Sequence, residues 1–155
     1  MTVRILTACA GFLLAVLWMD LIFDTQISGR ARDGDTDQAV ESISGYYRRA
    51  TTTSPPMSTL IVLVMGILLM ALAFEAIGGT RPGWMLALSA VLAGGPILLA
   101  LVRTVPNAVR LGRRTDPPDE QSRLARAILG DHIACIVGMC GFLVLWLLRG
   151  QTGVN

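Results

Sequence analysis

The chain has 155 residues, of which 53% are hydrophobic and 15% are charged. This composition is too apolar for an ordinary soluble domain, and a formal net charge of +2 is too small to indicate a nucleic-acid-binding protein. The three cysteines lie in apolar segments and form no Cys-x-x-Cys pair, which argues against thiol redox chemistry and a zinc site. All thirteen basic residues are arginine, which we attribute to codon bias in a GC-rich bacterium.

Four hydrophobic runs without a charged residue predict membrane-spanning helices, since a span needs about 20 apolar residues. The runs cover residues 5–19, 57–74, 83–102 and 133–148. The first and fourth are short, so they must recruit adjacent polar residues in order to cross a membrane. We therefore predict an all-α integral membrane four-helix bundle that forms a single domain over residues 1–155. Its predicted spans are 4–24, 57–76, 83–104 and 128–149, and its long loops are 25–56 and 105–127.

The distribution of arginine predicts the orientation of this bundle, because cytoplasmic loops carry an excess of positive charge. The first and third loops, with their borders, contain Arg30, Arg32, Arg48, Arg49, Arg103, Arg110, Arg113, Arg114, Arg123 and Arg126. The opposite side has only Arg4, Arg81 and Arg149. We expect a multi-pass protein of the bacterial plasma membrane, with both long loops in the cytoplasm and both termini outside.

The first long loop contains apolar residues at helical spacing: Ala39, Val40, Ile43, Tyr46 and Tyr47. This pattern predicts a short amphipathic cytoplasmic helix that lies on the inner membrane surface. Both tyrosines would then anchor the helix at the level of the lipid headgroups, and a catalytic role for either is the alternative interpretation.

The third hydrophobic run is interrupted at its midpoint by Gly94, Gly95 and Pro96, which predicts a kinked third span. One interpretation is a ligand cavity at the kink, and the other is close packing of a neighbouring helix against the small residues. The fourth span is the end of one long helix that begins near Asp116. Its glycines at positions 130, 138 and 141 would let other helices approach closely.

Three spans bring ionisable residues to one depth at the cytoplasmic boundary: Asp20, Arg103, Asp131 and His132. Such groups in a membrane protein indicate a functional site by default. In one interpretation His132 is a general base, Asp131 sets its tautomer and Arg103 holds an anion. In the other, the layer is structural and Arg103 neutralises the aspartates.

Two further residues belong to this predicted layer. Asp24 lies one helical turn beyond Asp20, and we expect its carboxylate to meet water. Asn107 follows Arg103 within about one turn. The types of ligand at Asp20, Asp131 and His132 would suit a metal, but the nearby arginine disfavours it. We expect neither a metal nor a cofactor.

The chain resembles the anthrone-oxygenase-like small membrane proteins in having four spans and a polar start to the last span. It also has Pro106 and Asn107 after the third span, where that family has a motif containing proline and asparagine. The resemblance implies cofactor-independent oxidation of an aromatic, lipid-soluble substrate without a metal.

Two hypotheses of function remain open at this point. In the first, the protein is a binding or accessory component whose polar layer serves a hydrophobic ligand or a membrane partner subunit. In the second, it is a cofactor-independent membrane enzyme, oxygenase-like or acid–base, in which His132 acts on an aromatic or quinone-like substrate. Both involve membrane lipid and neither involves nucleic acid. A single histidine and no nucleophile motif slightly favour the first, and oligomeric state is not predicted.

Overall fold

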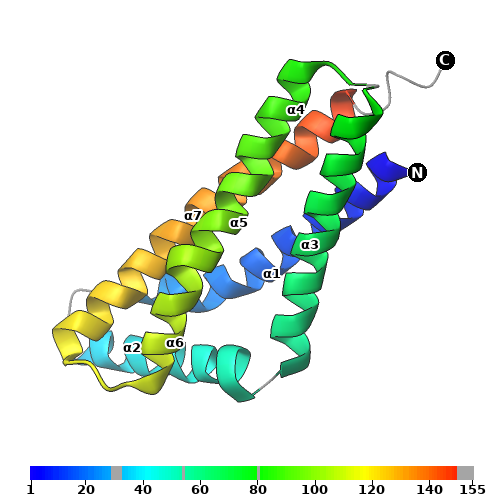
Figure 1. Cartoon of the computed structure of the whole chain (residues 1–155). Coiled ribbons are helices and arrows are strands. Elements are labelled where there is room, and N and C mark those ends of the chain that lie inside the picture. The colour runs from blue at the N-terminus through cyan, green and yellow to red at the C-terminus, as the bar shows by residue number, and fades with distance from the viewer. Residues whose placement is uncertain (29–32, 54, 80, 150–155) are drawn as a thin grey trace.

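The computed structural model describes residues 1–28, 33–53, 55–79 and 81–149, and helices account for almost all of them (Figure 1). Arg30 and Arg32, which contribute to the predicted orientation, lie outside the described residues. The helices of the first half are α1 (Thr2–Asp24), α2 (Asp33–Arg48) and α3 (Pro55–Gly78). Those of the second half are α4 (Gly83–Ser89), α5 (Gly95–Leu99), α6 (Val105–Arg113) and α7 (Pro118–Arg149). Short turns link several of them: η1 (Thr25–Ser28), η2 (Arg49–Thr53), η3 (Ala90–Gly94) and η4 (Ala100–Thr104).

Four helical segments in this part of the chain are long and apolar enough to cross a membrane. They are Thr2–Ser28, Pro56–Gly78, Gly83–Arg113 and Pro118–Leu148. The prediction of an all-helical protein with four apolar helices is thus confirmed. Many large hydrophobic side chains on these segments are exposed, as is expected where the surrounding medium is apolar.

The third of these segments is interrupted by two π-helical turns, η3 and η4, between α4, α5 and α6. Each turn contains the residue that lies four positions before a proline: Leu92 before Pro96, and Val102 before Pro106. Proline lacks an N–H, and its ring clashes with the carbonyl four residues earlier in a regular α-helix. A wider turn relieves this clash, and π-helical turns of this kind are frequent at functional sites.

Helix α2 is amphipathic, as the sequence predicted, but its two tyrosines contact protein and do not form an outward-facing anchor for lipid headgroups. Its apolar face is buried against α6 and α7, where Ile43 is fully buried and Tyr47 is 4% exposed (Figure 1). A Cβ on Gly112 of α6 would lie 3.0 Å from the backbone nitrogen of Arg48, so the two helices are closely packed. The prediction of lipid-anchoring tyrosines was wrong, because the same periodicity suits a protein core as well as a lipid surface.

Helix α7 packs against α1 on one side and against the third segment on the other. Its glycines contribute unequally to this packing. A Cβ on Gly138 would lie 2.7 Å from Cγ of Pro96 and 3.0 Å from the Leu92 carbonyl oxygen, and one on Gly141 would lie 3.3 Å from the Leu92 side chain. Gly130 has no such neighbour within 4 Å. Close packing against the interrupted segment is therefore confirmed for Gly138 and Gly141, but not for Gly130.

We expect Gly138→Ala to destabilise the protein by about 1–3 kcal/mol, because the added methyl group meets a rigid ring and a backbone carbonyl. Gly130→Ala on the same helix is the matched control and should stabilise by up to about 1 kcal/mol through helix propensity. Melting temperatures of both variants in detergent test this. A Gly138→Ala variant that melts at or above the wild-type temperature would contradict the described packing.

Candidate functional site

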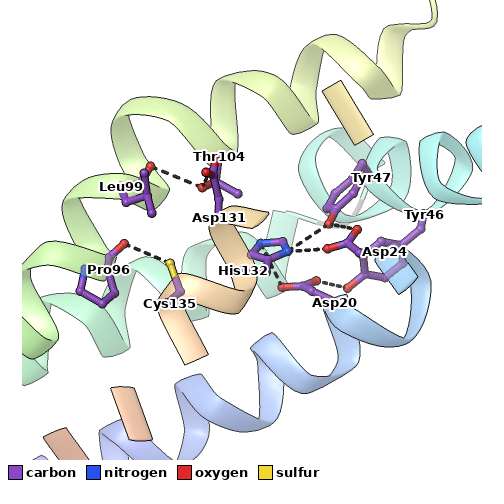
Figure 2. A network of polar contacts seen from close by, with 10 residues as sticks. All are labelled: Asp20, Asp24, Tyr46, Tyr47, Pro96, Leu99, Thr104, Asp131, His132 and Cys135. Atoms are coloured by element: carbon purple, nitrogen blue, oxygen red, sulfur yellow. Dashed lines mark hydrogen bonds and ion pairs between the residues drawn. The ribbon is translucent and has the colours of Figure 1, made fainter. Parts of the chain in front are cut away.

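Side chains from three helices meet at the end of the bundle where α2 lies (Figure 2). Asp20 and Asp24 come from α1, Tyr46 and Tyr47 from α2, and His132 from α7. The two aspartates are four residues apart, so both project from one face of α1. The sequence predicted that Asp20 and His132 would share a depth, and the structure brings them together.

One short contact of this group joins His132 Nδ1 to Asp24 Oδ2 at 2.6 Å. The other carboxylate oxygen, Oδ1, accepts a hydrogen bond from the Tyr47 hydroxyl at 2.7 Å. Asp24 is completely buried. A buried carboxylate without donors would be costly, and here the tyrosine and the imidazole supply them. Because the carboxylate accepts at Nδ1, the proton of the imidazole is held on Nδ1, and Nε2 faces the other way.

Asp20 lies on the Nε2 side of the imidazole. Its Oδ1 accepts a hydrogen bond from the Tyr46 hydroxyl at 2.6 Å. Its Oδ2 lies 3.8 Å from His132 Nε2, which is too long for a direct hydrogen bond. The Tyr46 ring stacks on Phe23 with a 4.1 Å centroid separation, which fixes the position of the hydroxyl.

The two tyrosines act as hydrogen-bond donors and not as bases. Burial raises the pKa of Tyr46 and of Tyr47, and the adjacent carboxylates raise both further. Their hydroxyls therefore stay protonated at neutral pH and continue to donate to Asp20 and Asp24.

Asp131 belongs to a second polar group on another face of α7, beside the third segment (Figure 2). Its Oδ2 lies 3.4 Å from Arg103 Nε and accepts a hydrogen bond from Thr104 Oγ1 at 3.3 Å. The Thr104 hydroxyl also lies 3.4 Å from the Leu99 carbonyl oxygen, within the π-helical turn η4. The expected contact between Arg103 and an aspartate is confirmed.

The roles expected of the aspartates need correction. Asp24, which was expected to meet water, is buried and holds His132. Asp131, which was expected to set the His132 tautomer, contacts Arg103 instead, because adjacent residues of a helix point in different directions. Asn107 is half-buried on α6, and its side chain makes no hydrogen bond to any residue that the structure describes.

The two tyrosines are the members of this polar group that sequence reasoning missed. Tyr46 and Tyr47 were interpreted as surface anchors, although a buried tyrosine normally requires a partner for its hydroxyl. The position of Tyr47 on the same apolar face as Ile43 was the signal that its hydroxyl would be buried. Over the described ranges, no three His, Cys, Asp or Glu side chains are placed to hold a metal ion.

A cavity of about 270 Å³ adjoins this group of side chains. Its apolar walls come from α1, α3, the third segment and α7, and include Leu17, Met65, Ile97, Leu101 and Met139. Its polar lining includes Asp20, Tyr46, Tyr47, Thr104 and His132. Pro96 also lines it, and the Pro96 carbonyl accepts a weak hydrogen bond from Cys135 Sγ at 3.6 Å. The interrupted segment therefore serves both purposes that the sequence left open, close packing on α7 and the wall of a cavity.

Comparison of the chain with protein-family models, with curated proteins and with solved structures found no match. The resemblance to the anthrone-oxygenase-like proteins stays a prediction. The chemistry of the site is therefore argued from its own geometry.

We expect selective ¹⁵N-histidine labelling to report on His132 alone, since it is the one histidine of the chain. The ring signals should show the proton on Nδ1. Asp24→Asn should change this pattern, whereas the matched variant Asp131→Asn should leave it close to wild type. The reverse result would restore Asp131 as the partner of the imidazole and overturn the described geometry.

Proposed function

We propose that the protein binds a lipid-soluble small molecule within the membrane, with the polar end of that molecule at His132. The observation that carries this proposal is the cavity, whose apolar walls end at a buried group of hydrogen-bonding side chains. Small-molecule sites commonly combine an apolar wall with a few polar groups that set orientation, and their volumes are about 300–1,000 Å³. The volume of about 270 Å³ suits a small ligand or the reactive end of a longer one.

The membrane setting supports this assignment. Exposed apolar residues such as Val62 and Leu101 flank the cavity on α3 and on the third segment. Helix α3 packs mainly on α1 and α4 and has little contact with α5 and α6, as the separation of their ribbons illustrates (Figure 1). Because lining residues of the cavity are exposed on the outside of the bundle, a ligand dissolved in the bilayer would reach the cavity sideways, without crossing water.

For the orientation, we propose that both termini lie outside and that the polar group lies at the cytoplasmic boundary. The excess of arginine at the end of the bundle that holds α2 supports it, since Arg110, Arg113, Arg114 and Arg123 are exposed there. In this arrangement α2 is a cytoplasmic helix that covers the inner end of the cavity.

Labelling with a membrane-impermeant thiol reagent tests the orientation in a variant without native cysteines. Thr115→Cys should be protected in intact cells, and Gly78→Cys should react. Both positions are exposed, and both should react after lysis, which controls for accessibility. Reaction at Thr115→Cys alone in intact cells would invert the proposed orientation.

Filling the cavity should abolish binding without disturbing the polar group. Ala100 lines the cavity, so we expect Ala100→Phe to release a ligand that co-purifies with the wild-type protein. Ala90→Phe is the matched control, because Ala90 lies exposed on the same segment. Native mass spectrometry of detergent-extracted protein measures the bound mass. A ligand retained in full by Ala100→Phe would place binding elsewhere, and a wild-type protein that never carries or accepts one would refute the proposal.

A second candidate function is acid–base catalysis on the bound molecule, and the Asp24–His132 contact favours it. A carboxylate on Nδ1 orients the imidazole and stabilises the imidazolium that forms when Nε2 accepts a proton from a substrate. Nε2 is the ring nitrogen without a close partner, and His132 lines the cavity. A lipid-soluble aromatic substrate, as the family resemblance implies, would present such a proton where it carries a phenolic O–H or an activated C–H bond.

Deuterium exchange tests this second function once the co-purifying ligand is in hand. In deuterated buffer the wild-type protein should catalyse exchange at a carbon atom of the ligand. His132→Gln should bind the ligand yet slow exchange by about 100-fold or more. Asp24→Asn should also slow it, and Asp131→Asn should not. Undiminished exchange in His132→Gln would leave binding as the only supported function.

A further inference from the structure

The polar end of the cavity carries more acidic than basic groups. Asp20 and Asp24 face one imidazole, which supplies at most one positive charge. Arg103, which in one interpretation of the sequence neutralises the aspartates, contacts Asp131 on another face of α7. Within the part of the chain that the structure describes, no arginine forms an ion pair with Asp20 or Asp24. Whichever charge His132 carries, two ionised aspartates leave at least one negative charge uncompensated.

The two aspartates differ in how fully they are satisfied. Asp24 is completely buried, and both of its oxygens have close partners, the Tyr47 hydroxyl and His132 Nδ1. Asp20 has a donor on Oδ1 only, while Oδ2 stands 3.8 Å from His132 Nε2. Asp20 also lines the cavity. The uncompensated charge is therefore located where a ligand can reach it, on Asp20 Oδ2.

An uncompensated charge surrounded by apolar groups is unfavourable, and it is relieved either by a proton or by a cation. From this juxtaposition we propose that the ligand is a lipid-soluble cation, a protonated amine with an apolar tail, whose ammonium group binds Asp20 Oδ2. This inference rests on the proposed function and specifies its ligand class. The ammonium group supplies hydrogen-bond donors to the unsatisfied oxygen, and a charge-assisted bond of this kind is stronger than one between neutral groups.

The same geometry disfavours ligands with an anionic or a neutral head group. A carboxylate or phosphate would come against two aspartates that pair with no arginine among the described residues, so the repulsion would not be offset there. A neutral hydroxyl could donate one hydrogen bond but would leave the charge uncompensated. The apolar walls accommodate the tail of any of the three, so discrimination among them depends on charge at Asp20.

Three ligands with the same chain length test this inference: octylamine, octanol and octanoate, at neutral pH. Equilibrium dialysis against the full-length protein in a non-ionic detergent, with protein-free micelles subtracted, measures binding. Octylamine should bind at least about tenfold more tightly than either of the others, because only its head group forms a charge-assisted bond. Asp20→Asn should abolish this preference. Asp37→Asn, which removes an exposed carboxylate from α2, should retain it.

The outcomes separate the inference from the function on which it rests. If octanol or octanoate binds as tightly as octylamine, the cavity is a ligand site but the cationic class is wrong. If none of the three binds, both the inference and the proposed ligand site fail. Binding of the three ligands to the wild-type protein distinguishes these two outcomes even if Asp20→Asn fails to fold. A folded Asp20→Asn that keeps the preference for octylamine would also overturn the inference.

Discussion

The hydrogen-bonded contact between Asp24 and His132 is the interaction on which the rest of this end of the protein depends. It connects α1 to α7 through the 2.6 Å contact of Asp24 Oδ2 with His132 Nδ1. The hydroxyl of Tyr47, on α2, donates a hydrogen bond to the same carboxylate. Removing one partner of a buried pair typically costs about 3–5 kcal/mol, because the remaining charge stays buried. The contact therefore fixes the mutual positions of three helices and, with them, the polar end of the cavity.

The apolar part of the structure follows from rules that operate along the chain. Runs of uncharged residues of sufficient length become helices that hide every backbone polar group, so the four long helices could be predicted from the sequence. The shortness of the first and last runs also indicated that Asp20 and His132 would lie at one depth. Depth along a helix follows from counting residues, which is why this part of the site was predictable.

The direction of each side chain around its helix was not predictable in the same way. Counting placed Asp131 and His132 together, but one faces the third segment and the other faces α1 and α2. Which face of α7 meets which neighbour depends on how the helices pack, and that is decided by contacts such as Gly138 against Pro96. The burial of Asp24 depends on α2, which closes over it as part of the fold.

The two prolines of the third segment connect packing to the site. Each is accommodated by a π-helical turn, and the second turn carries both Arg103 and Thr104. A π-helical turn changes the rotation of the residues within it, and here it places the Thr104 hydroxyl near Asp131 Oδ2 while Ala100 and Leu101 line the cavity. The π-helical turn therefore allows the third segment to supply an ion-pair partner for Asp131 and, on another face, a wall of the cavity.

The polar residues form two separate groups. The structural interpretation of the layer applies to the group around Arg103 and Asp131, and the functional interpretation applies to the group around His132. Arg103 is 56% exposed and Asp131 is 5% exposed, so the guanidinium reaches outward while its carboxylate partner stays inside. This pair satisfies Asp131 and secures the third segment to α7, which is a structural role. Because the arginine is engaged there, it does not neutralise Asp20 and Asp24, and the negative charge at the cavity remains. Adjacent residues of α7 therefore serve different purposes: Asp131 contributes to the fold, and His132 to the cavity where the proposed ligand would bind.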